Sequence, residues 1–395
     1  MWRQTVACLC ALAGVAHADS KRKGTPPPPA SLEDPCLDSA CTHHALDGFA
    51  AALAATRAKT ATHPLRISYF GDSLTADDHI TDALRKHLQA QLGDGGAGFI
   101  WAVPPHPFCE HRAMARGVVG DWLVHGVSTA TPGDRLLGLG GSAETSDGVI
   151  RIAPSGAVTS IDVHYLAQPH GGSLEVVADG KSIGKLATAS DRKTSAFGKL
   201  DVAPGTRRIE LRTSGGRVRL FGATLETSAG AVVDNLGIVN ATAKAFAHNN
   251  LAAHWQTQLA HRAPDLAVIM LGTNEAEWLH RGPGIVEHEA VFDELLATVR
   301  AANPSGSCLV VSPLDQLDWR DDKMPPRDSV PNLVEAQRRA AAKAGCAFWD
   351  VYAWMGGKGS SATWYKRGLV VKDFQHPTSE GAELLADALF RGLVK

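Results

Sequence analysis

A serine near the start of the chain and an aspartate–histidine pair near its end have the residue types of a nucleophilic site. Ser73 lies in Gly-Asp-Ser-Leu after the apolar run 65–70, and Asp373 precedes His376 by three residues, before the last helical pattern. A serine hydroxyl becomes nucleophilic when a base removes its proton, and the base needs a group that fixes its tautomer. We therefore predict Ser73 as nucleophile, His376 as base and Asp373 as the orienting group. Taken singly, Ser73 also fits a helix cap, and the other two fit an ordinary ion pair.

Two further polar turns could supply hydrogen-bond donors to the same site. Asn274, in Gly-Thr-Asn-Glu, follows the apolar run 266–271, and Asn240 closes a turn after the run 232–239. In an open α/β sheet, the turns at the carboxyl ends of parallel strands meet at the edge where ligands bind. Glu275 is close enough in sequence to line the same pocket.

The motifs Gly-Asp-Ser-Leu, Gly-Thr-Asn-Glu and Asp-x-x-His-Pro-Thr occur in this order, and in this the chain resembles the SGNH (GDSL-type) hydrolases. The resemblance implies an oxyanion hole made by the Ser73 backbone N–H, the Asn274 side-chain amide and a backbone N–H in the block 235–242. That block usually has two glycines three residues apart, whereas here the first is Gly237 and the second position is Asn240. Asparagine tolerates left-handed dihedrals and keeps its backbone N–H. We expect Asn240 to donate, with Gly237 shaping the turn or acting as the alternative donor, and we expect no metal and no cofactor.

The periodicity of the chain predicts an α/β fold. Runs of apolar and β-branched residues predict strands, and amphipathic patterns predict helices between them. The alternation indicates a five-stranded parallel sheet with helices on both faces, and the resemblance implies three layers in the flavodoxin-like order. The predicted strands are 65–70, 232–239, 266–271, 308–312 and 347–351, and the main helices are 44–59, 80–92, 243–261, 285–302, 331–344 and 378–393.

Residues 115–228 differ in character from the rest. Short alternating strands separated by Gly, Pro, Asp and Ser turns indicate an inserted all-β sandwich or jelly roll, similar to a carbohydrate-binding module. This block divides the predicted hydrolase domain into a first part at 44–114 and a second part at 229–395. We expect the sandwich to contact carbohydrate, to form one wall of the cleft or to pack as a spacer. The Gly- and Pro-rich stretch 93–111 is interpreted as a tight loop, or alternatively as a source of aromatic and histidine side chains for the cleft.

The N-terminal residues predict export. Residues 1–18 have a charged start, an apolar core too short to span a bilayer and the cleavage pattern Ala-His-Ala, as in a signal peptide. A stiff, solvated Pro-rich linker is predicted over 19–43. We therefore expect an exported protein, periplasmic or secreted, without a transmembrane segment. A net charge of −2 and the lack of basic motifs argue against binding to nucleic acid.

Five cysteines follow the predicted cleavage site, and an oxidising compartment permits disulfides. Cys36 and Cys41 could close a small loop, and Cys308 and Cys346 each begin an apolar run and could lie on adjacent strands. With Cys109 the number is odd, so one cysteine must remain unpaired, and the sequence leaves the pairing open.

The substrate is suggested by resemblance, because a fold alone does not give it. The interrupting β block and the stretch 346–381 are similar to those of secreted two-domain SGNH esterases such as bacterial peptidoglycan O-acetylesterases. This implies a serine esterase that removes O-acetyl groups from a cell-envelope glycan, with O-acetylated peptidoglycan as the expected partner. The alternatives are an esterase for other polysaccharides or for small or lipid esters, a sugar O-acetyltransferase, and a glycan-binding protein on an inactive SGNH scaffold. The sequence does not give the oligomeric state.

Overall fold

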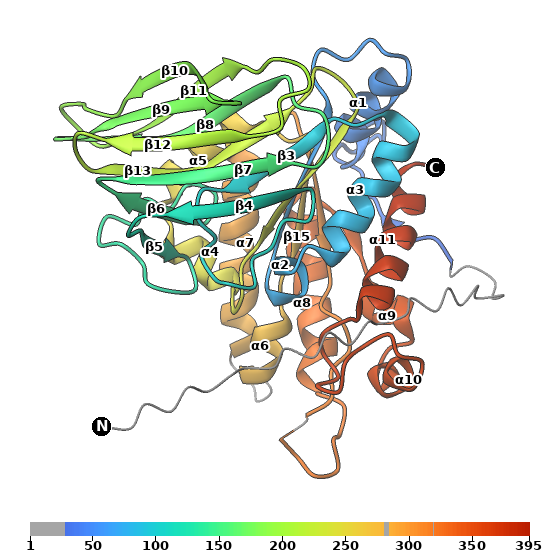
Figure 1. Ribbon diagram of the computed structural model, residues 1–395. Helices are drawn as coiled ribbons and strands as arrows, with labels where there is room; N and C mark the ends of the chain where they lie inside the picture. The colour runs from blue at the N-terminus through green and yellow to red at the C-terminus, as the bar shows by residue number, and fades with distance from the viewer. Residues whose placement is uncertain (1–27, 280–283, 319) are drawn as a thin grey trace, which may run out of the picture.

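The computed structural model describes residues 28–279, 284–318 and 320–395, and the chain forms two parts that lie side by side (Figure 1). One part is a mostly parallel sheet covered by helices, and the other is a pair of antiparallel sheets. The signal peptide expected over 1–18 and the first residues of the expected linker lie outside the described residues.

The helix-covered sheet has six strands in the order β1-β17-β16-β15-β2-β14. Five of them run parallel: β2 (Leu65–Gly71), β14 (Ala231–Gly237), β15 (Leu266–Met270), β16 (Ser307–Val311) and β17 (Ala347–Trp349). Each coincides with a predicted strand to within two residues. Numbered along the chain, they stand in the order 2-1-3-4-5, which is the flavodoxin-like arrangement. The order reverses at β2, so Ser73 follows the strand at the topological switch point, where ligands bind in such sheets.

The sixth strand, β1 (Leu32–Glu33), pairs antiparallel with β17 and was not predicted. It shows that the prediction of a solvated linker through residue 43 is wrong for this segment. Ala30 is 1% exposed, and its N–H donates to Ala388 O at 2.8 Å. A Cβ on Gly392 would lie 2.9 Å from the Ala30 Cβ, so the small residues allow the segment to lie directly against the last helix.

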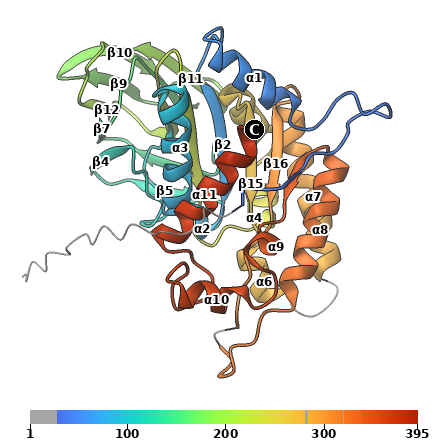
Figure 2. The ribbon, with the colours of Figure 1, turned by 90° about the vertical axis from the view of Figure 1, so that its right-hand side faces the viewer.

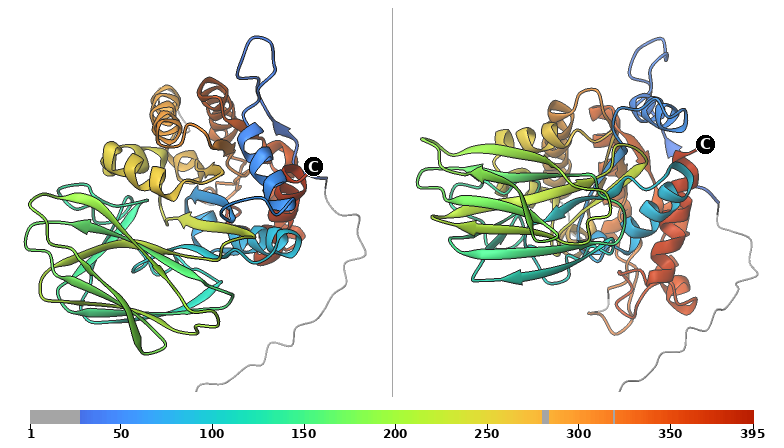
Figure 3. Two further views of the ribbon diagram at one scale, coloured as in Figure 1. Left: turned by 90° about the horizontal axis from the view of Figure 1, so that it is seen from above. Right: turned by 45° about the horizontal axis from the view of Figure 1, so that its top comes forward.

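Helices cover both faces of this sheet (Figures 2 and 3). One core includes Tyr69 and the helices α1 (Asp47–Arg57), α3 (His79–Leu92) and α11 (Ser379–Leu393). The opposite core includes Phe70 and the helices α4 (Ala243–Asn249), α5 (Ala252–Arg262), α7 (Gly284–Ala302) and α8 (Ser329–Ala344). Successive residues of a strand point to opposite faces of the sheet. A strand that is buried on both faces therefore has a continuous run of apolar residues in its sequence.

Four short helices complete this part of the structure: α2 (Ser73–Ala76), α6 (Thr273–Trp278), α9 (Val351–Met355) and α10 (Ser360–Lys366). The first three follow the carboxyl ends of β2, β15 and β17. Among the helices in the described ranges, none combines the length and the apolar character that crossing a membrane requires.

The helix predicted over 243–261 is divided into α4 and α5 at Asn250. The Asn250 side chain donates to Gly138 O at 2.9 Å and accepts from the Leu137 N–H at 3.3 Å, and the Leu251 N–H donates to Arg135 O at 2.9 Å. These tertiary hydrogen bonds satisfy backbone groups of the loop 135–138 and replace the continuous helical pattern that the local sequence favours.

The second part consists of two antiparallel sheets, in the orders β10-β9-β12-β7-β4 and β11-β8-β13-β6-β5. Apolar side chains from both sheets, such as Ile150, Val163, Leu211 and Leu220, form a core of their own. The strands are β4 (Met114–Val119), β5 (Leu123–Gly126), β6 (Gly141–Thr145), β7 (Gly148–Pro154), β8 (Ser160–Ala167), β9 (Ser173–Ala178), β10 (Lys181–Ala187), β11 (Thr194–Asp201), β12 (Ile209–Ser214) and β13 (Val218–Glu226).

A further strand, β3 (Gly96–Trp101), pairs antiparallel with β13, so the interpretation of 93–111 as a loop is wrong for its first half. Strand pairing with these sheets thus begins before residue 115. Its glycines reflect close packing instead of a turn: Gly98 has a φ of 76°, and a Cβ there would lie 2.5 Å from Asp234 Oδ1. Glycine in a strand often marks such a close approach.

Both cysteine pairs considered from the sequence are bonded. Cys36 is joined to Cys41. Cys308 in β16 is joined to Cys346, the residue directly before β17, and β16 and β17 are neighbouring strands. Cys109 is buried and unpaired.

Candidate active site

The turn that presents Ser73 begins at a glycine that has no space for a side chain. β2 ends at Gly71, where a Cβ would lie 2.1 Å from Thr75 Oγ1. The Asp72 carboxylate accepts from the Leu74 N–H at 3.0 Å and caps α2, so Ser73 is the first residue of a helix, with the positive end of its dipole beside the hydroxyl. Ser73 is therefore held at the carboxyl end of β2, as the sequence predicts.

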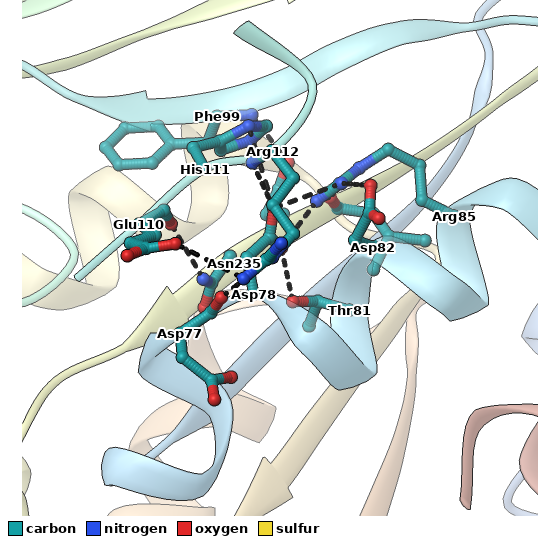
Figure 4. A network of polar contacts seen from close by, with 12 residues as sticks. Asp77, Asp78, Thr81, Asp82, Arg85, Phe99, Glu110, His111, Arg112 and Asn235 are labelled. Carbon is teal, nitrogen blue, oxygen red and sulfur yellow. Dashed lines mark hydrogen bonds and ion pairs between the residues drawn. The ribbon is translucent and has the colours of Figure 1, made fainter. Parts of the chain in front are cut away.

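A buried polar network holds the other end of this turn (Figure 4). Asp78 has a φ of 60°, and its carboxylate accepts from Arg85 Nη2 at 3.0 Å, from the Arg112 backbone N–H at 2.6 Å and from the Thr81 hydroxyl. Burial alone would raise the pKa of Asp78, but the charge of Arg85 and the hydrogen bonds outweigh burial and lower it. The ionised carboxylate thus joins the loop before β4 to the start of α3.

The side chain of Asn235 connects the same network to β14. It donates to Ala76 O at 3.1 Å and to Glu110 O at 3.0 Å, and it accepts from the Gly237 N–H at 3.0 Å. A Cβ on Gly237 would lie 2.4 Å from the Ala76 nitrogen. The N–H of Gly237 is therefore already bound, and the lack of a side chain at this position allows α2 to pack on β14. This favours a structural role for Gly237 over that of an alternative donor.

Ser73, His376 and Asp373 lie in one hydrogen-bonded chain. Ser73 Oγ is 2.8 Å from His376 Nε2, and His376 Nδ1 is 2.8 Å from Asp373 Oδ2. All three side chains are partly buried. This is the geometry in which an imidazole can take a proton from a serine hydroxyl while a carboxylate fixes its tautomer.

The loop 371–378 brings the last two residues into register. Asp373 Oδ1 accepts from the backbone N–H groups of Gln375 at 2.9 Å and His376 at 3.0 Å, and Phe374 between them has a φ of 58°. One carboxylate oxygen therefore shapes the loop, and the other remains for the imidazole. This local turn explains why three residues separate the two side chains.

The electrostatic environment favours a protonated imidazole paired with an ionised carboxylate. Burial disfavours the imidazolium, but the hydrogen bond with Asp373 and its charge outweigh burial, so the pKa of His376 is raised above 6.5. Burial likewise raises the pKa of Asp373, but the hydrogen bonds from His376 and from the backbone outweigh it, and the net shift is downward. An imidazole made more basic in this way is suited to accept a proton from a hydroxyl.

Asn240 and Asn274 line the cavity that contains Ser73. Asn240 has a φ of 60°, the left-handed conformation that the missing glycine would have adopted easily. Asn274 Nδ2 donates to Ala241 O at 2.8 Å, which leaves its second amide hydrogen for a ligand. The two asparagines therefore lie where the resemblance expects oxyanion donors.

The cavity has a volume of about 760 Å³. Its lining residues come from the ends of α2, the loop before β4, the turns after β14 and β15 and the loop before α11; they are Ser73, Asp77, His79, Phe108, Glu110, Val239, Asn240, Asn274, Glu277, Val371, Asp373, Gln375, His376, Pro377, Thr378 and Ser379. In the described part of the chain, β4 to β13 contribute no residue to this lining.

Several lining residues were not predicted from the sequence. From the stretch 93–111, Phe108 and Glu110 reach the cavity, whereas Trp101, His106 and His111 do not line it. Phe108 is 66% exposed, an apolar ring left in water, but this exposure is a property of the folded loop, and the sequence carries no signal for it. Glu275 also does not line this cavity, so the expectation that it lines the pocket is wrong; it is buried and lines an adjoining cavity together with Lys244 and Glu287.

Two groups of residues could in principle hold a metal ion within the described ranges. The first includes Cys36 and Cys41, which are bonded to each other. The second is Asp162 with His164 and His261, but His261 Nε2 is 2.7 Å from Asp162 Oδ2, and His164 Nδ1 is 3.0 Å from Gln258 Oε1, so these atoms already have partners within the protein. Neither group includes a residue of the cavity around Ser73.

Comparisons with known proteins relate the chain to established hydrolases. The GDSL-like Lipase/Acylhydrolase family matches residues 203–384, a range that contains Asn240, Asn274, Asp373 and His376. The fold is similar to that of a peptidoglycan O-acetylesterase, with a TM-score of 0.75 and 24% identity over 88% of this chain and 95% of that chain. The structure of an acetylxylan esterase from Geobacillus stearothermophilus is less similar, with a TM-score of 0.29 and 22% identity over 41% of this chain and 73% of that chain. Among curated proteins, no sequence matches significantly.

The family match over residues 203–384 and the similar fold support an SGNH (GDSL-type) hydrolase. Its enzyme class is therefore that of the carboxylic ester hydrolases, and within this class it resembles peptidoglycan O-acetylesterases.

Proposed function

We propose that the protein is an exported O-acetylesterase that acts on a cell-envelope glycan through Ser73, His376 and Asp373. The observation that carries the proposal is the chain of two 2.8 Å hydrogen bonds from Ser73 through His376 to Asp373, in the wall of a cavity that also contains Asn240 and Asn274.

In the proposed mechanism, Ser73 Oγ attacks the acetyl carbonyl while His376 Nε2 takes its proton. The tetrahedral oxyanion accepts hydrogen bonds from the Ser73 and Asn240 backbone N–H groups and from the Asn274 side chain. His376 then gives its proton to the departing sugar hydroxyl, which leaves acetyl-Ser73. Water attacks this ester as His376 takes a proton from it; the bond between the acyl carbon and Ser73 Oγ then breaks, His376 returns the proton to Ser73 Oγ, and acetic acid leaves as acetate. Asp373 stabilises the imidazolium in both steps and remains ionised.

A glycan substrate is supported by the size of the cavity and by the two-part fold. About 760 Å³ is far more than an acetyl group fills, so sugar rings could lie in the same cavity. The likeness to a peptidoglycan O-acetylesterase extends over both parts of the chain, and we take O-acetylated peptidoglycan as the proposed substrate. In this proposal any contact of the antiparallel sheets with the polymer lies beyond the cavity, because β4 to β13 supply none of its described lining.

Export completes the proposal. Residues 1–18 have the sequence of a signal peptide, and removal of this segment would release the mature chain outside the cytoplasm, where a cell-wall glycan is accessible. Fractionation of cells that produce the full chain, with N-terminal sequencing of the exported form, tests this directly. Recovery of an uncleaved chain in the cytoplasm would contradict it.

The substrate is tested by measuring acetate release from O-acetylated peptidoglycan, acetylated xylan and p-nitrophenyl acetate, with Ser73→Ala as control. The proposal predicts release from peptidoglycan and from the small ester by wild type only. Release from the small ester or xylan but not from peptidoglycan would retain the esterase and reject the substrate. Transfer of acetyl to an added oligosaccharide in place of water would indicate a transferase.

A further inference from the structure

Asn274 and Glu275 hold the turn that contains Asn240. Asn274 Nδ2 donates to Ala241 O at 2.8 Å, and Glu275 Oε1 accepts from the Ala243 N–H at 2.8 Å. Two successive side chains of α6 therefore bind two peptide groups of the segment 240–243, one through a carbonyl and one through an N–H.

This turn needs such support because Asn240 has a φ of 60°. A residue other than glycine in this region carries backbone strain and keeps the conformation only where its surroundings enforce it. The direction of the Asn240 N–H depends on that conformation. The contacts at Ala241 and Ala243, directly after Asn240, thus help to determine where its N–H points.

Glu275 is an unusual residue to find in this supporting position. It is 6% exposed, and its Oε2 is buried without a hydrogen-bond partner. A buried carboxylate with an unsatisfied oxygen is costly to maintain, and such groups are concentrated at functional sites. Its hydrogen bond with the Ala243 N–H, at 2.8 Å, joins it to the oxyanion turn, and the backbone of Glu275 itself and of Gly272 also contributes hydrogen bonds to the carboxyl group.

We propose that Glu275 is a positioning residue, which fixes the oxyanion turn through the Ala243 N–H and sets by its charge how firmly the Asn240 N–H is held. It does not touch the substrate, because it lies outside the lining of the cavity that contains Ser73. The inference rests on the proposed esterase function and adds to it a second group whose ionisation controls the rate.

The surroundings of Glu275 allow its charge to change near neutral pH. Burial raises the pKa of Glu275 to about 7; the hydrogen bond from Ala243 opposes the rise, and the charge of Asp72 adds to it. A carboxylate accepts more strongly than a carboxylic acid. The Ala243 N–H is therefore held best above this pKa and less well below it.

The other charged neighbours do not offset this change. His288 of α7 lies 3.9 Å from Glu275, but burial lowers the pKa of His288 to about 4, so it is neutral when Glu275 titrates. Lys244 of α4 and Glu287 of α7 line the adjoining cavity and form an ion pair with each other at 2.8 Å. Glu275 and His376 thus lose protons in the same direction, and the rate rises with pH through both ionisations.

The test compares Glu275→Gln and Glu275→Ala with wild type on p-nitrophenyl acetate, with kcat and KM measured across pH. Glu287→Gln is the matched control, since it removes the same charge from the rim of the adjoining cavity. Thermal unfolding confirms that each variant is folded. In Glu275→Ala we expect kcat to fall roughly 10- to 100-fold with KM little changed, a smaller loss than removal of a donor causes.

The glutamine variant distinguishes positioning from a structural role. Its amide oxygen still accepts from Ala243 but carries no charge at any pH, so kcat at high pH falls below wild type, though by less than in Glu275→Ala. The acid limb of log kcat then follows the single ionisation of His376, whereas the wild-type limb is steeper. Wild-type kcat in Glu275→Ala, or a wild-type slope in Glu275→Gln, would overturn the positioning role alone. A folded wild type without esterase activity would overturn the proposed function and the positioning role with it.

Discussion

The substitution Asp373→Asn separates the two tasks of this carboxylate. Oδ1 accepts from the backbone N–H groups of Gln375 and His376, and Oδ2 binds His376 Nδ1. An asparagine keeps Oδ1 and therefore the loop, but its amide nitrogen cannot accept the imidazole proton. The ring then favours the tautomer with hydrogen on Nε2, which cannot accept from Ser73.

The size of the effect follows from this change of tautomer. Loss of the orienting carboxylate with its geometry intact lowers kcat roughly 10⁴-fold in serine hydrolases, which corresponds to about 5.4 kcal/mol. The acid limb should also move. Asp373 supplies the main interaction that raises the pKa of His376 against burial, so in Asp373→Asn that pKa falls, and the residual activity persists to lower pH than in wild type.

The assay is hydrolysis of p-nitrophenyl acetate from below pH 5 to above pH 8, with the folded state checked by thermal unfolding. Two observables are expected to change together: a large drop in kcat and a shift of the acid limb toward lower pH. A variant with wild-type kcat, or one whose acid limb moves to higher pH, would refute the assignment of Asp373 as the partner of His376.

The remaining predictions concern the oxyanion hole and the supports around it. Asn274→Ala should lower kcat on the same ester roughly 100- to 1000-fold, because it removes one oxyanion donor, and an unchanged kcat would exclude that role. Arg85→Ala leaves the buried Asp78 carboxylate without its cation and should lower the free energy of unfolding by about 3–5 kcal/mol in denaturant titrations; a loss below 1 kcal/mol would contradict the role of this pair. Replacing Cys308 and Cys346 by serine opens a loop with a sequence separation of 38 and should cost roughly 4 kcal/mol of stability in the same titrations, whereas equal stability would show that the disulfide does not contribute.

The central sheet was predictable because its strands are buried on both faces. A continuous apolar run such as Leu266–Met270 has few alternatives in a chain where such runs alternate with amphipathic helices. The edge strand β1 could not be predicted, because two residues have no period, and its pairing depends on the small residues that let Ala30 lie against α11. β3 was missed because glycine favours turns locally, whereas here it allows close approach to Asp234.

Much of the candidate site was also predictable. The positions of Ser73, Asp373 and His376 follow from motifs whose local turns are determined by neighbouring residues, and the structure brings them within hydrogen-bonding distance. Their catalytic roles remain predictions. The contributions of Phe108 and Glu110 were not predictable, because they depend on a tertiary network that folds their loop over α2, and no periodic pattern indicates such a loop.

The proposed mechanism depends most directly on Ser73 forming the covalent acyl-enzyme. Incubation of the folded protein with an organophosphonate esterase probe, followed by peptide mapping, identifies the reactive nucleophile. Ser379 also lines the cavity, so Ser379→Ala serves as the matched control for Ser73→Ala. The account predicts one adduct, on the peptide that contains Ser73, present in wild type and Ser379→Ala and absent in Ser73→Ala and His376→Ala. An adduct on another residue, or none in an active wild-type enzyme, would contradict it.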